Sequence, residues 1–172
     1  MRLAFSTNAF KKNTLAEAID AIAQVGYAGV EIMADVPHAY PPTFAPEQRE
    51  STKRQIASRG LQVSNINAFT LFARGDTYHP TWIEDDPALR EQRSRHTLDS
   101  IELAREFDAK TVSLQPGGPT IGMTIDRAEA ARRFADGLLS APGSGLPHDF
   151  LRAAHIPFQG DRAASSPDTT TC

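Results

Sequence analysis

The sequence lacks the features that define several classes of protein. It has 172 residues and one cysteine, Cys172, so it can form neither an intrachain disulfide nor a cysteine-based metal site. It has no apolar run of about 18 residues, which would be needed for a membrane-spanning helix, and no signal-peptide core follows Met1. The net charge is −3 with both signs interspersed, which predicts no basic surface for nucleic acid or an anionic membrane. The composition predicts a cytoplasmic globular protein.

What the sequence does contain is an alternation of short apolar runs and longer amphipathic stretches. The short runs predict strands at residues 3–8, 29–33, 61–69 and 111–115. Apolar residues at helical spacing, introduced by capping signals, predict helices at 14–25, 46–59, 87–107 and about 127–139. Long loops are predicted after the second and third strands.

This alternation predicts an α/β fold with a parallel sheet and right-handed crossovers. An open doubly wound sheet and part of a (β/α)8 barrel both fit the order of elements. A nucleotide-binding doubly wound sheet would have a glycine-rich turn after its first strand, and residues 6–13 contain no glycine. We therefore predict a parallel TIM-barrel type of fold that is incomplete, with about four βα units.

The last part of the chain has a different composition. Residues 141–172 contain no lysine and no glutamate, and they show no apolar periodicity. We expect residues 1–139 to form the partial barrel and residues 140–172 to be an irregular tail. A shifted reading frame after Leu139 would explain the abrupt change, and a natural flexible tail is the alternative.

Four segments carry a family resemblance: Leu3–Phe10, Val25–Met33, Val63–Phe69 and Pro116–Pro119. Together they resemble the N-terminal half of a sugar phosphate isomerase/epimerase of the xylose isomerase-like TIM barrels. The same superfamily includes DNA-repair enzymes of the endonuclease IV type. The resemblance implies a small-molecule sugar substrate, and a divalent metal ion (Mn²⁺, Mg²⁺ or Zn²⁺) is expected of the full-length family.

The sequence also departs from that family. The family's metal-binding carboxylates and histidine come from later strands, and no glutamate follows Glu129 here. Gln115 stands where the subgroup often has a glutamate before Pro-Gly-Gly. Since a full barrel needs about 250 residues, we predict little or no activity for this chain alone.

Polar residues near the carboxyl ends of the predicted strands are candidates for substrate binding, because a barrel has its active site there. They are Asn8, Glu31, Asn67 and Gln115. Glu31 interrupts an apolar run, where a carboxylate is costly to bury without a partner. It could bind a substrate hydroxyl, or alternatively form an internal ion pair. We expect only one of Asn65 and Asn67 to point inward, and Asn67 is closer to the strand end.

Two residues of the second long loop, His79 and Trp82, are also predicted to contact substrate, with Trp82 as an aromatic platform for a sugar. An exposed or locally packed His–Trp cluster is the alternative. Glu31, His38 and His79 are suitable ligand types for a metal ion, but their spacing does not select such a site, so no metal ligand is assigned. His96 is expected on a solvated helix face.

Two further functional readings remain open. The chain could be a non-catalytic half-barrel that associates with itself or with another chain through open sheet edges. An endonuclease IV-like role in DNA repair would need a basic groove and metal-binding histidines, and the acidic balance of the sequence makes it the less favoured reading.

Overall fold

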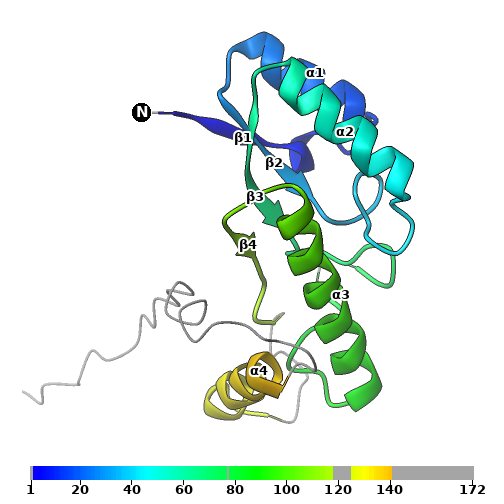
Figure 1. The fold of residues 1–172 in the computed structure, drawn as a ribbon. Helices are drawn as coiled ribbons and strands as arrows, with labels where there is room; N and C mark the ends of the chain where they lie inside the picture. Colours follow the sequence, from blue (N-terminus) through cyan, green and yellow to red (C-terminus); the bar gives the residue numbers. More distant parts are fainter. Residues whose placement is uncertain (1, 77, 118–124, 141–172) are drawn as a thin grey trace, which may run out of the picture.

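The computed structural model describes residues 2–76, 78–117 and 125–140, and these form a parallel sheet with helices (Figure 1). The elements in chain order are β1 (Ala4–Ser6), the 3₁₀ helix η1 (Thr7–Phe10), α1 (Leu15–Val25), β2 (Gly29–Met33), α2 (Pro46–Ser58), β3 (Gln62–Asn67), α3 (Pro87–Glu106), β4 (Val112–Ser113) and α4 (Arg127–Ser140). The strand order is β1-β2-β3-β4, and each neighbouring pair is parallel. This arrangement confirms the predicted partial TIM barrel.

The helix boundaries follow the capping signals in the sequence. The Thr14 hydroxyl accepts the Glu17 N–H, and the Glu17 carboxylate accepts the Thr14 N–H, which completes a capping box at α1. Asp86 accepts the Ala88 N–H at the start of α3. Gly26 ends α1 with φ of 95°, a left-handed conformation that favours glycine.

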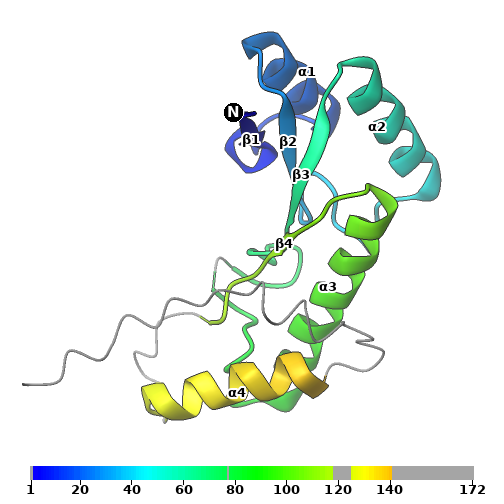
Figure 2. The same cartoon turned by 60° about the vertical axis from the view of Figure 1, so that its left-hand side comes forward.

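One face of the sheet carries the main hydrophobic core. Val30, Ile32 and Ile66 are fully buried, and they pack in one cluster with side chains of α1, α2 and α3 such as Ile19 and Leu103. Figures 1 and 2 show these helices beside the strands. Burial of each such side chain contributes about 1.5–3 kcal/mol, so this face holds the strands and helices together.

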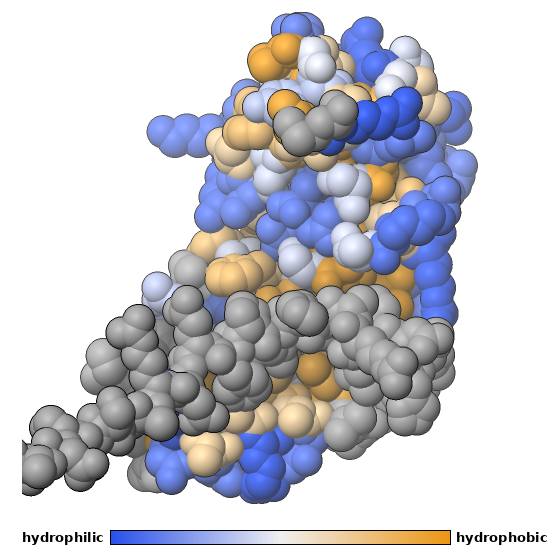
Figure 3. Space-filling view, turned by 90° about the vertical axis from the view of Figure 1, so that its left-hand side faces the viewer, coloured by the Kyte–Doolittle hydropathy of each residue, from blue (hydrophilic) through white to orange (hydrophobic). Residues whose placement is uncertain are grey.

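The opposite face, which we call the inner face, carries polar side chains. The register pairs Glu31 with Ser6 on one side and with Asn65 on the other. An irregularity beside Val30 and Glu31 leaves Ser64 as an extra residue on β3, as in a β-bulge. Figure 3 views the molecule from the side away from α2 and α3, and hydrophilic residues gather across its middle.

A second, smaller core lies between α4 and the segment before α3. Trp82 and Ile83 pack with Phe134 and Leu138, and the Trp82 and Phe134 ring centroids are 5.9 Å apart. A Cβ on Gly137 would lie 2.6 Å from the Trp82 ring, so the glycine allows α4 to approach closely. The tertiary contact therefore depends on a residue that is unfavourable within a helix.

The structure corrects several details of the sequence prediction. β1 and β4 are shorter than predicted, because an extended run is a strand only where a neighbouring strand pairs with it. On α3 the apolar Leu98 and Ile101 are only partly buried, whereas Arg93 and His96 are buried. Of the predicted tail, only Ser140, at the end of α4, lies within the described residues. Gly118 and Pro119 also lie outside them.

Within the described ranges, no helix has the length and apolar character needed to cross a membrane.

Candidate functional site

The carboxylate of Glu31 is the centre of a polar cluster on the inner face. The Nδ2 group of Asn65 donates to Oε2 of Glu31 at 2.7 Å, and the Nδ2 group of Asn67 donates to Oε1 at 2.9 Å. Asn65 also donates to the Ser113 hydroxyl at 3.0 Å, which extends the cluster to β4. An internal ion pair was the alternative for Glu31. Among the described residues, its hydrogen-bond partners are instead two neutral amides.

Both amides are oriented by a second contact. Oδ1 of Asn65 accepts the hydroxyl of Thr111 at 2.9 Å, and Oδ1 of Asn67 accepts the N–H of Phe69 at 3.0 Å. The NH₂ groups must then face Glu31. A carboxylate offers about four acceptor positions, and the two amides use one on each oxygen. Glu31 is half-buried, so it can accept further hydrogen bonds from a ligand's hydroxyl groups.

The expectation that only one of the two asparagines points inward is wrong. Side chains alternate between the faces of a strand, so residues two positions apart share a face. Asn65 and Asn67 therefore both reach the carboxylate of Glu31. The sequence pattern contained this information, and the alternation rule, correctly applied, would have added Asn65 to the candidates.

A buried aspartate joins the loops at the carboxyl end of the sheet. Asp35, which follows β2, is fully buried, and its carboxylate accepts the N–H groups of Val36, Phe72 and Ala73 at 2.8, 2.6 and 3.1 Å. The last two donors belong to the loop after β3. Sequence patterns did not indicate this role, because an aspartate before a proline-rich segment is typical of an exposed turn.

Two basic side chains of α3 lie beneath these loops. Arg93 is 2% exposed and donates to the Phe69 carbonyl at 2.5 Å; burial lowers its pKa to about 10, and the charge of Asp35 opposes that shift. His96 is 4% exposed, and burial together with the Arg93 charge lowers its pKa to about 4. The ring of His96 is therefore neutral at pH 7, and its predicted position on a solvated face is corrected.

Two of the predicted polar residues have local contacts away from Glu31. Asn8 lies in η1, and its backbone N–H donates to the Ser6 hydroxyl at 3.2 Å. Gln115 is buried just after β4, and its side-chain amide donates to the Gly117 carbonyl at 3.1 Å. Of the four strand-end candidates, the structure joins Glu31 and Asn67 by a hydrogen bond, and the roles of Asn8 and Gln115 stay predictions.

His79 is paired with a carboxylate, Glu84, that was not among the residues predicted from the sequence. Its Nδ1 lies 2.7 Å from Oε1 of Glu84, which is buried and also accepts the Thr81 N–H at 2.9 Å. The hydrogen bond to Glu84 raises the pKa of His79, against a smaller effect of burial. A glutamate five residues after a histidine, next to an apolar pair, is the signal that could have indicated the contact.

Trp82 lies three residues after His79, and its surroundings differ. Its side chain is 1% exposed and belongs to the second core, in edge contact with Phe134. The locally packed alternative describes this tryptophan well, although His79 is not part of that core. Its use as a sugar platform stays a prediction, and it would require the Phe134 contact to open.

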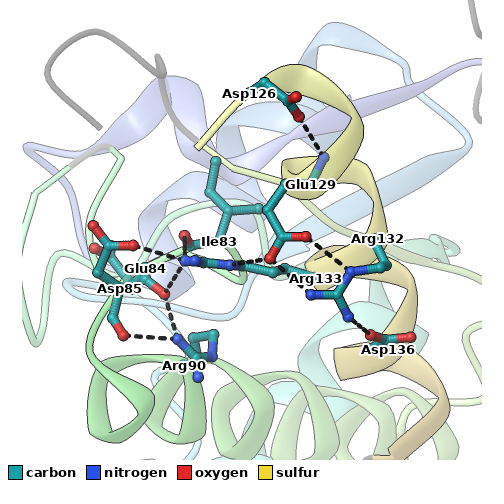
Figure 4. Close-up of polar contacts among 9 residues, drawn as sticks. All are labelled: Ile83, Glu84, Asp85, Arg90, Asp126, Glu129, Arg132, Arg133 and Asp136. Carbon is teal, nitrogen blue, oxygen red and sulfur yellow. Dashed lines mark hydrogen bonds and ion pairs between the residues drawn. The ribbon is translucent and has the colours of Figure 1, made fainter. Parts of the chain in front are cut away.

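The peptide of Glu84 is held from both neighbouring helices. Arg90 of α3 donates to the Glu84 carbonyl at 2.5 Å and Arg133 of α4 donates to it at 3.1 Å (Figure 4). Arg133 also pairs with Asp85 and Glu129, at 2.9 and 3.0 Å. These contacts border a cavity of about 490 Å³ between α3 and α4. Each arginine in this group has an acidic or carbonyl partner, so the cluster anchors the loop to α4.

The described residues do not fit a metal site. No group of three histidine, cysteine, aspartate or glutamate side chains among them is arranged to hold a metal ion. Of the three candidate ligands, Glu31 binds the asparagines, His79 binds Glu84, and Nε2 of His38 lies 3.2 Å from the Asn13 carbonyl. The metal ion implied by the resemblance therefore has no binding site assigned in this part of the chain.

A family model described as "Xylose isomerase-like TIM barrel" matches residues 19–141. No curated protein matches the chain.

The structure resembles several solved structures. A D-psicose 3-epimerase determined in the presence of D-fructose has a TM-score of 0.62 at 12% identity, over 80% of this chain and 46% of that one. The 3-keto-D-glucoside 4-epimerase YcjR from E. coli has a TM-score of 0.57 at 16% identity, over 81% and 49%. An AP endonuclease of family 2 from Brucella melitensis has a TM-score of 0.52 at 18% identity, over 80% and 48%. The chain thus spans about half the length of these proteins, and the likeness concerns the fold.

Proposed function

The chain belongs to the xylose isomerase-like TIM barrel family, and we propose that it is the sugar-binding half of an isomerase or epimerase for a sugar or sugar phosphate. The observation that carries this proposal is the Glu31 carboxylate, fixed by Asn65 and Asn67 near the carboxyl ends of parallel strands. Ligands of parallel α/β sheets bind at that end. Sugar hydroxyls are good donors to such a carboxylate.

The chemistry of such enzymes defines what this chain would contribute. Epimerisation and isomerisation move a proton next to a carbonyl, and a divalent metal ion holds the substrate oxygens in many enzymes of this type. The described residues do not supply that metal site. Their contribution is to bind and orient hydroxyl groups, with Glu31 as an acceptor and the second amide hydrogen of Asn67 as a donor.

The substitution Glu31→Gln is expected to weaken binding of D-fructose, D-tagatose or their phosphates by at least about tenfold. A hydrogen bond to a charged group contributes about 1.5–3 kcal/mol, and about 1.4 kcal/mol is a factor of ten. Chemical-shift titration of the 172-residue chain measures this effect. The matched control is Glu47→Gln in the exposed first turn of α2. Equal affinities of the two variants would contradict a role for Glu31.

The chain by itself is expected to show little or no turnover. Purified protein would be assayed with Mn²⁺ or Mg²⁺ across ketose and aldose substrates, both free and phosphorylated. Because no metal site is present among the described residues, sugar binding without turnover is the expected result. Robust turnover would overturn this part of the proposal and leave the binding proposal intact.

A second candidate function is that of a half-barrel that pairs with itself or with another chain. In the described sheet, β1 and β4 each have one neighbouring strand, so each has an outer edge. Unpaired edges are templates for association. Light scattering of the purified chain should then give the mass of a dimer, and a well-folded monomer would argue against pairing.

A role in DNA repair is the less favoured alternative. The likeness to the AP endonuclease is a likeness of fold alone, and the net charge of −3 gives no support for a DNA-binding groove. Cleavage of a duplex containing an abasic site would favour repair over sugar chemistry.

We also propose that the protein is cytoplasmic. Recovery of the protein in the cytosolic fraction of cells would support this location.

A further inference from the structure

The loop that carries His79 is built by short-range hydrogen bonds. Oδ1 of Asp76 accepts the N–H groups of Tyr78 and His79 at 2.7 and 2.8 Å, and the Asp76 N–H donates to the His79 carbonyl at 2.9 Å. A Cβ on Gly75 would lie 2.1 Å from that carbonyl oxygen, so a larger residue would force the loop to shift. The backbone of His79 is thus held in place by contacts that do not involve its side chain.

The imidazole ring is oriented by a buried carboxylate. Oε1 of Glu84 accepts the N–H of Thr81, so it acts as an acceptor, and Nδ1 of His79 at 2.7 Å must be the donor. The neutral ring then has its lone pair on Nε2. The His79 side chain is 50% exposed and that of Glu84 is 11% exposed. The ring therefore turns its Nδ1 edge inward and its other edge toward solvent.

The backbone of Glu84 is held in place by two helices, and its carboxylate accepts the Thr81 N–H. Arg90 and Arg133 both donate to the Glu84 carbonyl, and Figure 4 shows them approaching it from α3 and α4. An exposed ion pair contributes only about 0–1 kcal/mol and needs no such support. The two arginine contacts therefore distinguish the His79–Glu84 pair from an incidental surface pair. A carboxylate at Nδ1, as Glu84 provides for His79, is the contact by which proteins orient an imidazole for proton transfer.

The position of this pair relates it to the Glu31 cluster. His79 lies in the loop that follows β3, and β3 ends at Asn67, which donates to Glu31. The adjoining part of the same loop is tied to the loop after β2 through Asp35. Ligands bind outside the carboxyl ends of parallel strands, and the loop that carries His79 begins at that end of the sheet.

We propose that His79 is a proton-transfer residue for a hydroxyl group of the bound sugar, with Glu84 as its positioning residue. This inference rests on the proposed sugar-binding function. In the forward step the hydroxyl O–H bond breaks, its electron pair stays on oxygen, and the proton moves to Nε2. The resulting imidazolium is balanced by the Glu84 carboxylate, and the reverse step returns the proton.

The charges around the ring support this exchange. The hydrogen bond to Glu84 is the main cause that raises the pKa of His79, and the charges of Glu84 and Asp76 add to it. From the helices, Arg90 and Arg133 face the peptide of Glu84. The imidazolium is thus favoured by two carboxylates.

Modification of histidine by diethyl pyrocarbonate tests the proposal with the full 172-residue chain. The neutral Nε2 attacks a carbonyl carbon of the reagent, a C–O bond breaks, and ethyl carbonate leaves. Mass spectrometry resolves each histidine. We expect His79 to react readily, with buried His38 and His96 as slow internal references. The pH dependence of its rate should have an inflection above 6.5, and Glu84→Gln should lower that inflection.

D-fructose is the probe for the location of the ring. At ten times its dissociation constant about one site in eleven is free, so modification of His79 should slow about tenfold. The control Glu47→Gln should leave both the inflection and the protection unchanged. An inflection unaffected by Glu84→Gln would overturn the pairing. Chemical-shift changes at Asn67 without slower modification of His79 would overturn the role of His79 and leave the proposed sugar binding intact. Absence of any sugar binding would overturn both.

Discussion

The substitution Asp35→Asn is expected to lower the free energy of unfolding by about 3–5 kcal/mol, the range for breaking a buried charge pair. The Asp35 carboxylate is fully buried and accepts three backbone N–H groups. Its charge also favours the charged form of Arg93, which is itself buried. The amide would leave that guanidinium without a buried counter-charge. Urea unfolding, with the slope checked for constancy, measures the loss.

A double-mutant cycle separates the charge effect from the backbone contacts. Arg93→Met removes the cation and keeps an apolar side chain of similar length. If Asp35 and Arg93 interact, the double variant should lose less stability than the sum of the two single variants. A loss of less than about 1 kcal/mol for Asp35→Asn, the central value for ordinary substitutions, would contradict the role assigned to this carboxylate.

Acidification is expected to destabilise the fold through His96. Its pKa is lowered from 6.5 to about 4 by burial and by the charge of Arg93. Between these values the unfolded chain binds more protons than the folded one, so stability is complete above pH 6.5 and falls as the pH drops to about 4. At about 1.4 kcal/mol per pH unit, the loss attributable to His96 amounts to about 3 kcal/mol.

The variant His96→Leu isolates this effect. It should show a flatter dependence of unfolding free energy on pH between 6.5 and 4, whatever its stability at pH 7. His38, whose pKa burial also lowers, contributes in the same direction in both proteins. His79→Gln is the contrasting control, because the pKa of His79 is raised and its contribution is greatest at low pH. Identical pH profiles for the wild type and His96→Leu would contradict the assignment.

The polar cluster of the inner face shows how much of the site could be predicted. Glu31 was identified because a carboxylate within an apolar run needs a partner, and Asn67 because it stands near the end of its strand. The amide partners themselves are thirty-four and thirty-six positions away in the sequence. Only the parallel pairing of β2 with β3 brings these side chains together.

Helix α3 shows where sequence patterns do not suffice. Its capping residue and first proline predicted the start, which the structure confirms. Its buried face, however, includes Arg93 and His96, which a hydrophobicity pattern assigns to solvent. Burial of these side chains depends on the loops after β2 and β3. The sequence of the helix does not predict how those loops fold over it.

The sequence by itself determined the order of strands and helices, the capped helix starts and the candidate Glu31, because these depend on propensities and periodicities over a few residues. The tertiary structure alone decided that Asp35 ties two loops together, that Trp82 is a core residue, and that His79 pairs with Glu84. Each of these depends on which side chains meet and which exclude water. Both are properties of the packed chain rather than of any single segment.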